Sequence, residues 1–124
     1  MKTCLIVEDA NFMVDLYRYL LKDLPIQFIG AVDDGATAVK MIQEHHPDLV
    51  LLDLILPVKN GFDVLAECSG LKTQFIAVSS INDPSRQKKA LDVGAIYFIE
   101  KPFKKIELIN AFEQIIYNQE VKHG

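Results

Sequence analysis

The sequence predicts an α/β fold in which a doubly wound, five-stranded parallel sheet is covered by five helices. The first observation is residues 49–57, of which eight are apolar or proline and one is Asp53. This density is typical of a strand buried on both faces of a parallel sheet. The second is the alternation of strand-like and helix-like segments, five times over, with short connections. Such alternation implies right-handed crossovers between parallel strands.

Each predicted strand is short and apolar, and each is followed by a segment with an apolar stripe at helical spacing. The predicted strands are residues 2–7, 27–32, 48–53, 74–78 and 95–99. The predicted helices are residues 11–24, 36–46, 62–68, 84–93 and 103–117.

Turn and capping residues set the boundaries in the first half of the chain. The first strand stops at the acidic pair Glu8 and Asp9, and Pro25 ends the helix that follows. Residues 33–35 form a turn that offers an N-cap to the second helix. Pro47 closes that helix.

Proline and glycine mark the boundaries in the second half. Pro57 cannot donate to a sheet ladder, so the third strand has ended by then and Asp53 lies at or near its carboxyl end. Asp83 followed by Pro84 is a typical helix start, and Gly94 stops that helix.

Composition indicates one domain over residues 1–124, with a polar, frayed tail at 119–124. A net charge of -4 argues against a nucleic-acid-binding module. No apolar run reaches the length of a membrane span, and the first residues do not read as a secretory signal. Cys4 and Cys68 are expected to be buried, reduced thiols, which favours a cytoplasmic protein.

Five chemically active side chains follow the predicted strands. Glu8 and Asp9 follow the first strand, Asp53 the third, Ser79 the fourth and Lys101 the fifth. In doubly wound sheets, chemistry gathers beyond the carboxyl ends of the strands. We therefore expect these acids, the hydroxyl and the amine to share one site.

Grouped carboxylates repel one another, so the site either raises a pKa or recruits a cation. Carboxylate oxygens with room for water are the ligands that Mg2+ prefers. A carboxylate is also a competent nucleophile toward phosphorus, and phosphoryl transfer needs mainly positioning and charge neutralisation. Lys101 and Ser79 are suited to neutralise and bond the remaining phosphoryl oxygens.

With these residues in this order, the chain resembles the receiver domain of two-component response regulators, the CheY-like superfamily, over nearly its whole length. The pieces that carry the resemblance are residues 7–9, residues 53–57 with Gly61, Ser79, residues 94–95, Phe98 and residues 101–103. Singly these are weak signals, but their order and spacing are specific. The resemblance implies a flavodoxin-like sheet with strand order 2-1-3-4-5.

The resemblance implies that Asp53 is the phosphoacceptor and that the cofactor is Mg2+. Asp9, Asp53 and the main-chain carbonyl of Ile55 would bind the ion directly, and Glu8 mostly through water. Glu8, Ser79 and Leu56 replace residues that are commoner in the family, but none of these departures removes a functional group.

By the same resemblance, Ser79 and Lys101 hold the phosphoryl group, and the Lys101–Pro102 bond is cis. Ser79 and Phe98 would form the switch that repacks the surface of the fourth helix, fifth strand and fifth helix. Tyr97, one position away, should point to the other face of its strand.

The implied function is a signalling switch that is phosphorylated by a sensor histidine kinase or a histidine phosphotransfer protein and is not itself an enzyme. It would control a downstream protein target. The same switch surface could also form a homodimer, and no direct contact with nucleic acid or membrane is expected. The chain is either a stand-alone regulator or a receiver from a longer protein, and its start at Met1 favours the former. The alternatives are a pseudo-receiver that binds partners without phosphorylation and a phosphatase with an aspartyl nucleophile.

Two further expectations concern apolar side chains. Ile106 and Tyr117 should form an exposed edge of the last helix that belongs to the partner surface. Ile55 and Ile81, each two residues after a site residue, should exclude attacking water and slow the loss of the phosphoryl group.

Overall fold

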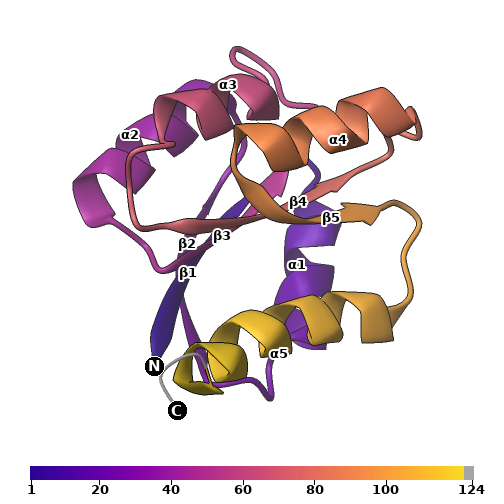
Figure 1. Cartoon of the computed structure of the whole chain (residues 1–124). Helices are drawn as coiled ribbons and strands as arrows, with labels where there is room; N and C mark the ends of the chain where they lie inside the picture. The colour runs from indigo at the N-terminus through magenta and orange to yellow at the C-terminus, as the bar shows by residue number, and fades with distance from the viewer. Residues whose placement is uncertain (122–124) are drawn as a thin grey trace.

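The computed structural model describes residues 1–121, in which strands and helices alternate along the whole chain (Figure 1). The strands are β1 (Lys2–Val7), β2 (Ile26–Val32), β3 (Leu49–Asp53), β4 (Gln74–Ser79) and β5 (Ala95–Glu100). The helices are α1 (Asn11–Leu20), α2 (Gly35–His45), α3 (Gly61–Glu67), α4 (Pro84–Val93) and α5 (Lys105–Val121). Within the described residues, none of these helices is both long and apolar enough to cross a bilayer.

The five strands form one parallel sheet in the order β2-β1-β3-β4-β5, which confirms the predicted fold class and strand order. Helices α1 and α5 cover one face of the sheet, and α2, α3 and α4 cover the other (Figure 1). The order makes β1, β3 and β4 consecutive neighbours, so their carboxyl ends lie side by side.

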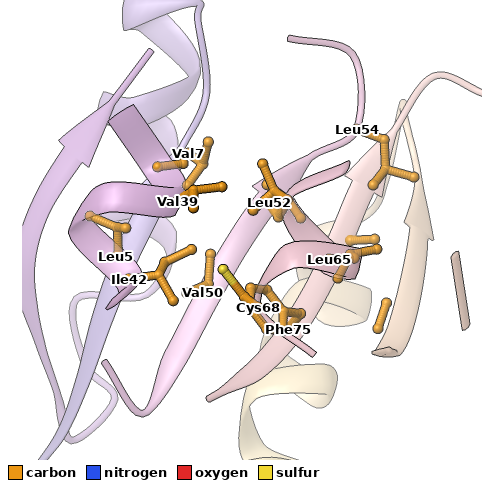
Figure 2. Close-up of a cluster of buried hydrophobic side chains, with 14 of the residues drawn as sticks. Leu5, Val7, Val39, Ile42, Val50, Leu52, Leu54, Leu65, Cys68 and Phe75 are labelled. Atoms are coloured by element: carbon orange, nitrogen blue, oxygen red, sulfur yellow. The ribbon is translucent and has the colours of Figure 1, made fainter. Parts of the chain in front are cut away.

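The central strands are apolar on both faces because a helix layer covers each face. Val50 and Leu52 pack in one cluster with α2 and α3, as Figure 2 shows, whereas Leu49 and Leu51 pack on the α1–α5 side. This period of two continues along β1 and β4. Polar groups are therefore confined to the ends of these strands.

Both cysteines are free and buried, as the sequence predicted. Cys4 lies on β1 among the apolar side chains of the α1–α5 face, and burial raises the pKa of its thiol to about 12. Cys68 follows α3 and packs in the opposite cluster (Figure 2). Neither thiol is therefore a ready nucleophile at neutral pH.

Helix α1 ends at Leu20, four residues earlier than the sequence predicted. Beyond it the chain tightens, with the Lys22 N–H donating to the Tyr19 carbonyl and the Leu24 N–H donating to the Leu21 carbonyl. These shorter turns keep Leu21 buried. They also let Leu24 leave the helical conformation, which the following proline disfavours.

Helix α5 begins and ends later than predicted. The Glu107 carboxylate accepts a hydrogen bond of 3.0 Å from the Lys104 N–H, and this capping interaction starts the helix at Lys105 rather than at residue 103. The helix continues to Val121, so residues 119–121 of the expected frayed tail are helical, and residues 122–124 lie outside the described residues.

Gly61 allows the loop after β3 to pack directly against the start of α3. Its N–H donates to the Leu54 carbonyl at 2.8 Å. A Cβ at this position would lie 2.5 Å from the Leu54 Cα and 2.7 Å from the Asp53 carbonyl oxygen. Both neighbours are backbone atoms, so they cannot turn away as a side chain would.

Replacing Gly61 by alanine should therefore lower the free energy of unfolding by about 2 kcal/mol, through overpacking against the backbone at Asp53. Urea denaturation followed by circular dichroism measures this change. Gly70 is the matched control, because a Cβ there meets nothing within 4 Å. Gly70→Ala should change the value by less than about 0.5 kcal/mol, and equal losses in the two variants would contradict the role assigned to Gly61.

Candidate functional site

The candidate site lies at the carboxyl ends of the strands, where the apolar pattern stops. Glu8 and Asp9 follow β1, Asp53 is the last residue of β3, and Ser79 is the last residue of β4. Lys101 comes directly after β5. The parallel arrangement brings all five side chains to one edge of the sheet, as the sequence predicted.

Three carboxylates meet at this edge. Glu8, Asp9 and Asp53 each offer an oxygen atom, and these atoms all lie within 4.8 Å of one another. Glu8 is only 2% exposed and Asp53 8%, whereas Asp9 is exposed. Two buried carboxylates this close are costly unless hydrogen bonds and positive charge compensate them.

The Lys101 ammonium supplies that positive charge to both buried acids. Its Nζ atom donates to Glu8 Oε1 at 2.8 Å and to Asp53 Oδ2 at 3.2 Å. The other oxygen of each acid accepts from a nearby backbone N–H: Ala10 donates to Glu8 at 3.1 Å, and Ile55 donates to Asp53 at 3.0 Å. All four carboxylate oxygens of the two acids are thus hydrogen-bonded.

The pKa values of the ion pair record this balance. Burial raises the pKa of Glu8 and the charge of Asp53 adds to the rise, while the bonds from Lys101 and the Ala10 N–H oppose it. Burial alone would lower the pKa of Lys101, but its bonds to Glu8 and Asp53 and their negative charge outweigh burial and raise it. The ammonium therefore stays charged, and Glu8 ionises less readily than a solvent-exposed glutamate.

Ser79 is fully buried at the end of β4, and its Oγ accepts a hydrogen bond of 3.4 Å from the Ile81 N–H. The Lys101 N–H donates to the Ser79 carbonyl at 2.8 Å, which ties the end of β5 to the end of β4. The serine hydroxyl proton thus remains available to another acceptor at this edge of the sheet.

Phe98 and Tyr97 lie on opposite faces of β5, as the sequence predicted. Phe98 packs with the cluster under α2, α3 and α4, and Tyr97 packs on the α1–α5 side. Phe98 is half-buried and packs in the core layer beside the site, so it is not one of the polar residues that form the site itself.

The three acids suit a hard divalent cation. They offer only oxygen atoms, the exposed side of Asp9 leaves access to solvent, and their mutual repulsion favours a positive ion between them. In the described structure the Lys101 ammonium partly fills that electrostatic role. The donor set therefore fits a magnesium ion coordinated by protein oxygens and water.

Tyr17, in α1, lies near the site but is not among the site residues that the sequence predicted. Its side chain is 1% exposed, and its ring stacks on Phe103 with centroids 6.0 Å apart and planes 11° from parallel. Phe103 follows Pro102, whose peptide bond with Lys101 is cis. A buried tyrosine hydroxyl normally needs a hydrogen-bond partner. A tyrosine among the apolar residues of a predicted core-facing helix is therefore the sequence signal that could have pointed to this position.

The chain resembles known proteins over nearly its full length. The family described as Response regulator receiver domain matches residues 4–113. The chemotaxis protein CheY of Halobacterium salinarum is 31% identical over 117 residues, covering 93% of this chain and 97% of that protein.

Solved structures give the same similarity. A signal receiver domain from Vibrio parahaemolyticus matches with a TM-score of 0.90 and 27% identity, covering 98% of this chain and 95% of that chain. A CheX–CheY complex with BeF3 and Mg2+ from Borrelia burgdorferi matches with a TM-score of 0.86 and 25% identity, covering 93% of this chain and 89% of the matched chain.

Replacing Lys101 by methionine should lower the free energy of unfolding by about 2 kcal/mol at neutral pH, because Glu8 and Asp53 stay buried without their shared cation. The loss should shrink as the pH falls through the pKa of Glu8, since a protonated carboxyl no longer needs the ammonium. Denaturant unfolding across a pH series measures both effects.

Lys88→Met is the matched control. Lys88 pairs with Asp92 at 2.7 Å, but both side chains are largely exposed. Its removal should leave the free energy of unfolding nearly unchanged at any pH, because an exposed ion pair contributes little to stability. A loss in Lys101→Met that stayed constant as the acids were protonated would mean that the lysine stabilises the fold by packing alone.

Proposed function

The chain belongs to the family of response regulator receiver domains, and we propose that it is a phosphorylation-activated signalling switch whose phosphoacceptor is Asp53. The observation that carries this proposal is the setting of the Asp53 carboxylate. It is buried at the end of an apolar strand, with an ammonium on one oxygen and a backbone N–H on the other. The switch acts on its own side chain and does not turn over a separate substrate.

The donor in this proposal is the phosphohistidine of a sensor histidine kinase or of a histidine phosphotransfer protein. An Asp53 oxygen forms a bond to phosphorus as the phosphorus–nitrogen bond breaks, and the imidazole nitrogen leaves with the electron pair. An aspartyl phosphate and a free histidine result. The Ser79 hydroxyl donates a hydrogen bond to one phosphoryl oxygen, and the Lys101 ammonium neutralises another.

Mg2+ is the cofactor that we propose for this site. Asp9, Asp53 and the main-chain carbonyl of Ile55 would hold it directly, with Glu8 acting through water. When bound, the ion neutralises the negative charge that the acids and the phosphoryl group bring together. The support is the oxygen-only cluster of three acids within 4.8 Å.

The donor protein would reach Asp53 past the cleft between α1 and the loop after β5. This cleft has a volume of about 550 Å³ and borders the site through Lys101. Its walls are mostly apolar and include Met13, Leu16 and Phe103, and Phe12 and Tyr19 on the same helix are exposed. An apolar surface beside the phosphoacceptor suits a helical donor protein.

The output surface that we propose is the face formed by α4, β5 and α5. Movement of Ser79 toward the phosphoryl group would open space for Phe98 to turn inward and would shift the population between two packings. Ile106 is 57% exposed and Tyr117 50%, and Ile96 and Leu91 are also exposed on these elements. Lys88, Lys89, Tyr97 and Lys104 are expected to change with this surface.

Such an apolar surface is suited to a downstream protein target or to a second copy of the chain in a homodimer. We place the switch in the cytoplasm, since its two buried free thiols suit a reducing compartment. We also propose that residues 1–124 form one domain.

Incubation with Mg2+ and acetyl phosphate should add one phosphoryl group to the chain, seen by intact mass. The adduct should be absent in Asp53→Asn and in wild-type protein treated with a chelator. Asp63→Asn, an exposed acid at the start of α3, is the control that should be phosphorylated normally. No adduct on the wild-type chain would favour a pseudo-receiver that binds partners without phosphorylation.

The aspartyl phosphate should decay slowly, because Ile55 and Ile81 offer no polar group to guide an attacking water. Both line a cleft of about 350 Å³ beside the site, and the Ile55 side chain is 54% exposed. The double variant Ile55→Asn with Ile81→Glu should lose its phosphoryl group about tenfold faster, which corresponds to 1.4 kcal/mol of barrier. Loss of radiolabelled phosphate over time measures the rate, and an unchanged half-life would contradict the assignment.

A further inference from the structure

The Tyr17 hydroxyl is a buried polar group without a partner. No atom of the described residues lies in hydrogen-bonding position to it, although its side chain is 1% exposed. Such groups are rare in folded proteins, because an unmade hydrogen bond costs free energy that a phenylalanine would not incur. The hydroxyl is therefore a candidate donor for a hydrogen bond that forms in another state of the protein.

Packing on both sides holds the Tyr17 ring in place. Tyr17 packs in the core cluster of the α1–α5 face and stacks on Phe103, two residues after Lys101. Burial raises the pKa of the Tyr17 hydroxyl, and the negative charges of Glu8 and Asp53 raise it further. The Glu8 side chain adds to the rise because it lies next to the hydroxyl, although the pair does not reach hydrogen-bonding geometry in the described state. The hydroxyl thus keeps its proton beside the two acids and can act as a hydrogen-bond donor.

The neighbouring Glu8 carboxylate is fully engaged in the described state. Lys101 bonds one of its oxygens at 2.8 Å, and the Ala10 N–H bonds the other at 3.1 Å. Lys101, however, is shared with Asp53. If the ammonium turns to a phosphoryl oxygen on Asp53, Glu8 loses its only side-chain donor among the described residues while it remains buried.

We propose that Tyr17 is a positioning residue whose hydroxyl donates a hydrogen bond to the Glu8 carboxylate when Lys101 turns to the phosphoryl group. This inference rests on the proposed function of Asp53 and Lys101. Glu8 exchanges one donor for another, so the acid stays oriented toward the metal position throughout. The unpartnered hydroxyl of the unphosphorylated state is the donor held for that exchange.

The two states make opposite demands on the hydroxyl. In the unphosphorylated protein it is an unsatisfied group, so its removal should be neutral or stabilising. In the phosphorylated protein it bonds a buried charge, so its removal should weaken that state about tenfold. A tyrosine that served only to fill the core would affect both states in the same direction.

The test uses Tyr17→Phe in the full chain, with beryllium fluoride and saturating Mg2+ as the probe of the phosphorylated state. Calorimetry gives the affinity for beryllium fluoride, and thermal unfolding without ligand gives the stability of the resting state. The near-ultraviolet difference spectrum on adding the probe reports the tyrosine that gains a hydrogen bond. Tyr19→Phe is the control, because Tyr19 lies on the same helix but is exposed.

Tyr17→Phe should melt at the wild-type temperature or above it, and its affinity for beryllium fluoride should be about tenfold weaker than that of the wild type. It should also lose the tyrosine difference signal. Tyr19→Phe should show none of these changes. Wild-type affinity in Tyr17→Phe overturns the role of the hydroxyl and leaves the proposed function intact. Parallel losses of melting temperature and affinity also overturn it, since they indicate a structural bond in both states. Failure of the wild-type chain to bind the probe overturns the proposed function and this inference together.

Discussion

The Lys101 ammonium, shared between two buried carboxylates, is the interaction on which the site depends. Glu8 directly follows β1 and Asp53 ends β3, both acids are buried beside apolar side chains, and a buried charge is costly without a cation nearby. The ammonium forms an ion pair with each acid in the described state. Because one cation serves two acids, a second positive ion or an incoming phosphoryl group changes the balance of the whole cluster.

The sheet makes this arrangement possible through its strand order. Neighbouring parallel strands lie about 4.8 Å apart, so β5 is separated from β3 by roughly twice that distance, because β4 lies between them. A short side chain after β5 could not approach Asp53 and Glu8, whereas the four-carbon stem of lysine can. The bond between the Lys101 N–H and the Ser79 carbonyl directs the chain across β4 toward the acids. Gly61 gives the loop after Asp53 room to pack against α3.

The two faces of the sheet bring different aromatic side chains toward the same edge. Tyr17 and Phe103 stack on the α1–α5 face, while Phe98 packs on the face covered by α2, α3 and α4. In the functions proposed above, Tyr17 compensates Glu8 and Phe98 reports the movement of Ser79. The core layers on either side of the sheet are then coupled to one charged site at the carboxyl ends of the strands.

Much of this protein follows from the sequence alone. Five apolar strands alternating with amphipathic helices determine the parallel sheet, and acids, a hydroxyl and an amine directly after those strands determine where chemistry gathers, because parallel strands end at a common edge. The order of the strands came from the resemblance to a family, since periodicity reports burial and not neighbours. Helix ends were less predictable: α1 stops at Leu20 through local turn bonds, and α5 starts at Lys105 through a side-chain cap.

Only the tertiary structure decided which of the gathered groups contact one another. It pairs Lys101 with Glu8 as well as Asp53, and it buries Ser79 with its hydroxyl bonded to the Ile81 N–H. It also places the hydroxyl of Tyr17 beside Glu8 without a hydrogen-bond partner among residues 1–121. The physical reason is that a hydrogen bond forms only when donor and acceptor lie within a few tenths of an ångström of their best separation, here between residues far apart in the chain. A sequence pattern specifies only the face and the end of an element on which each residue lies.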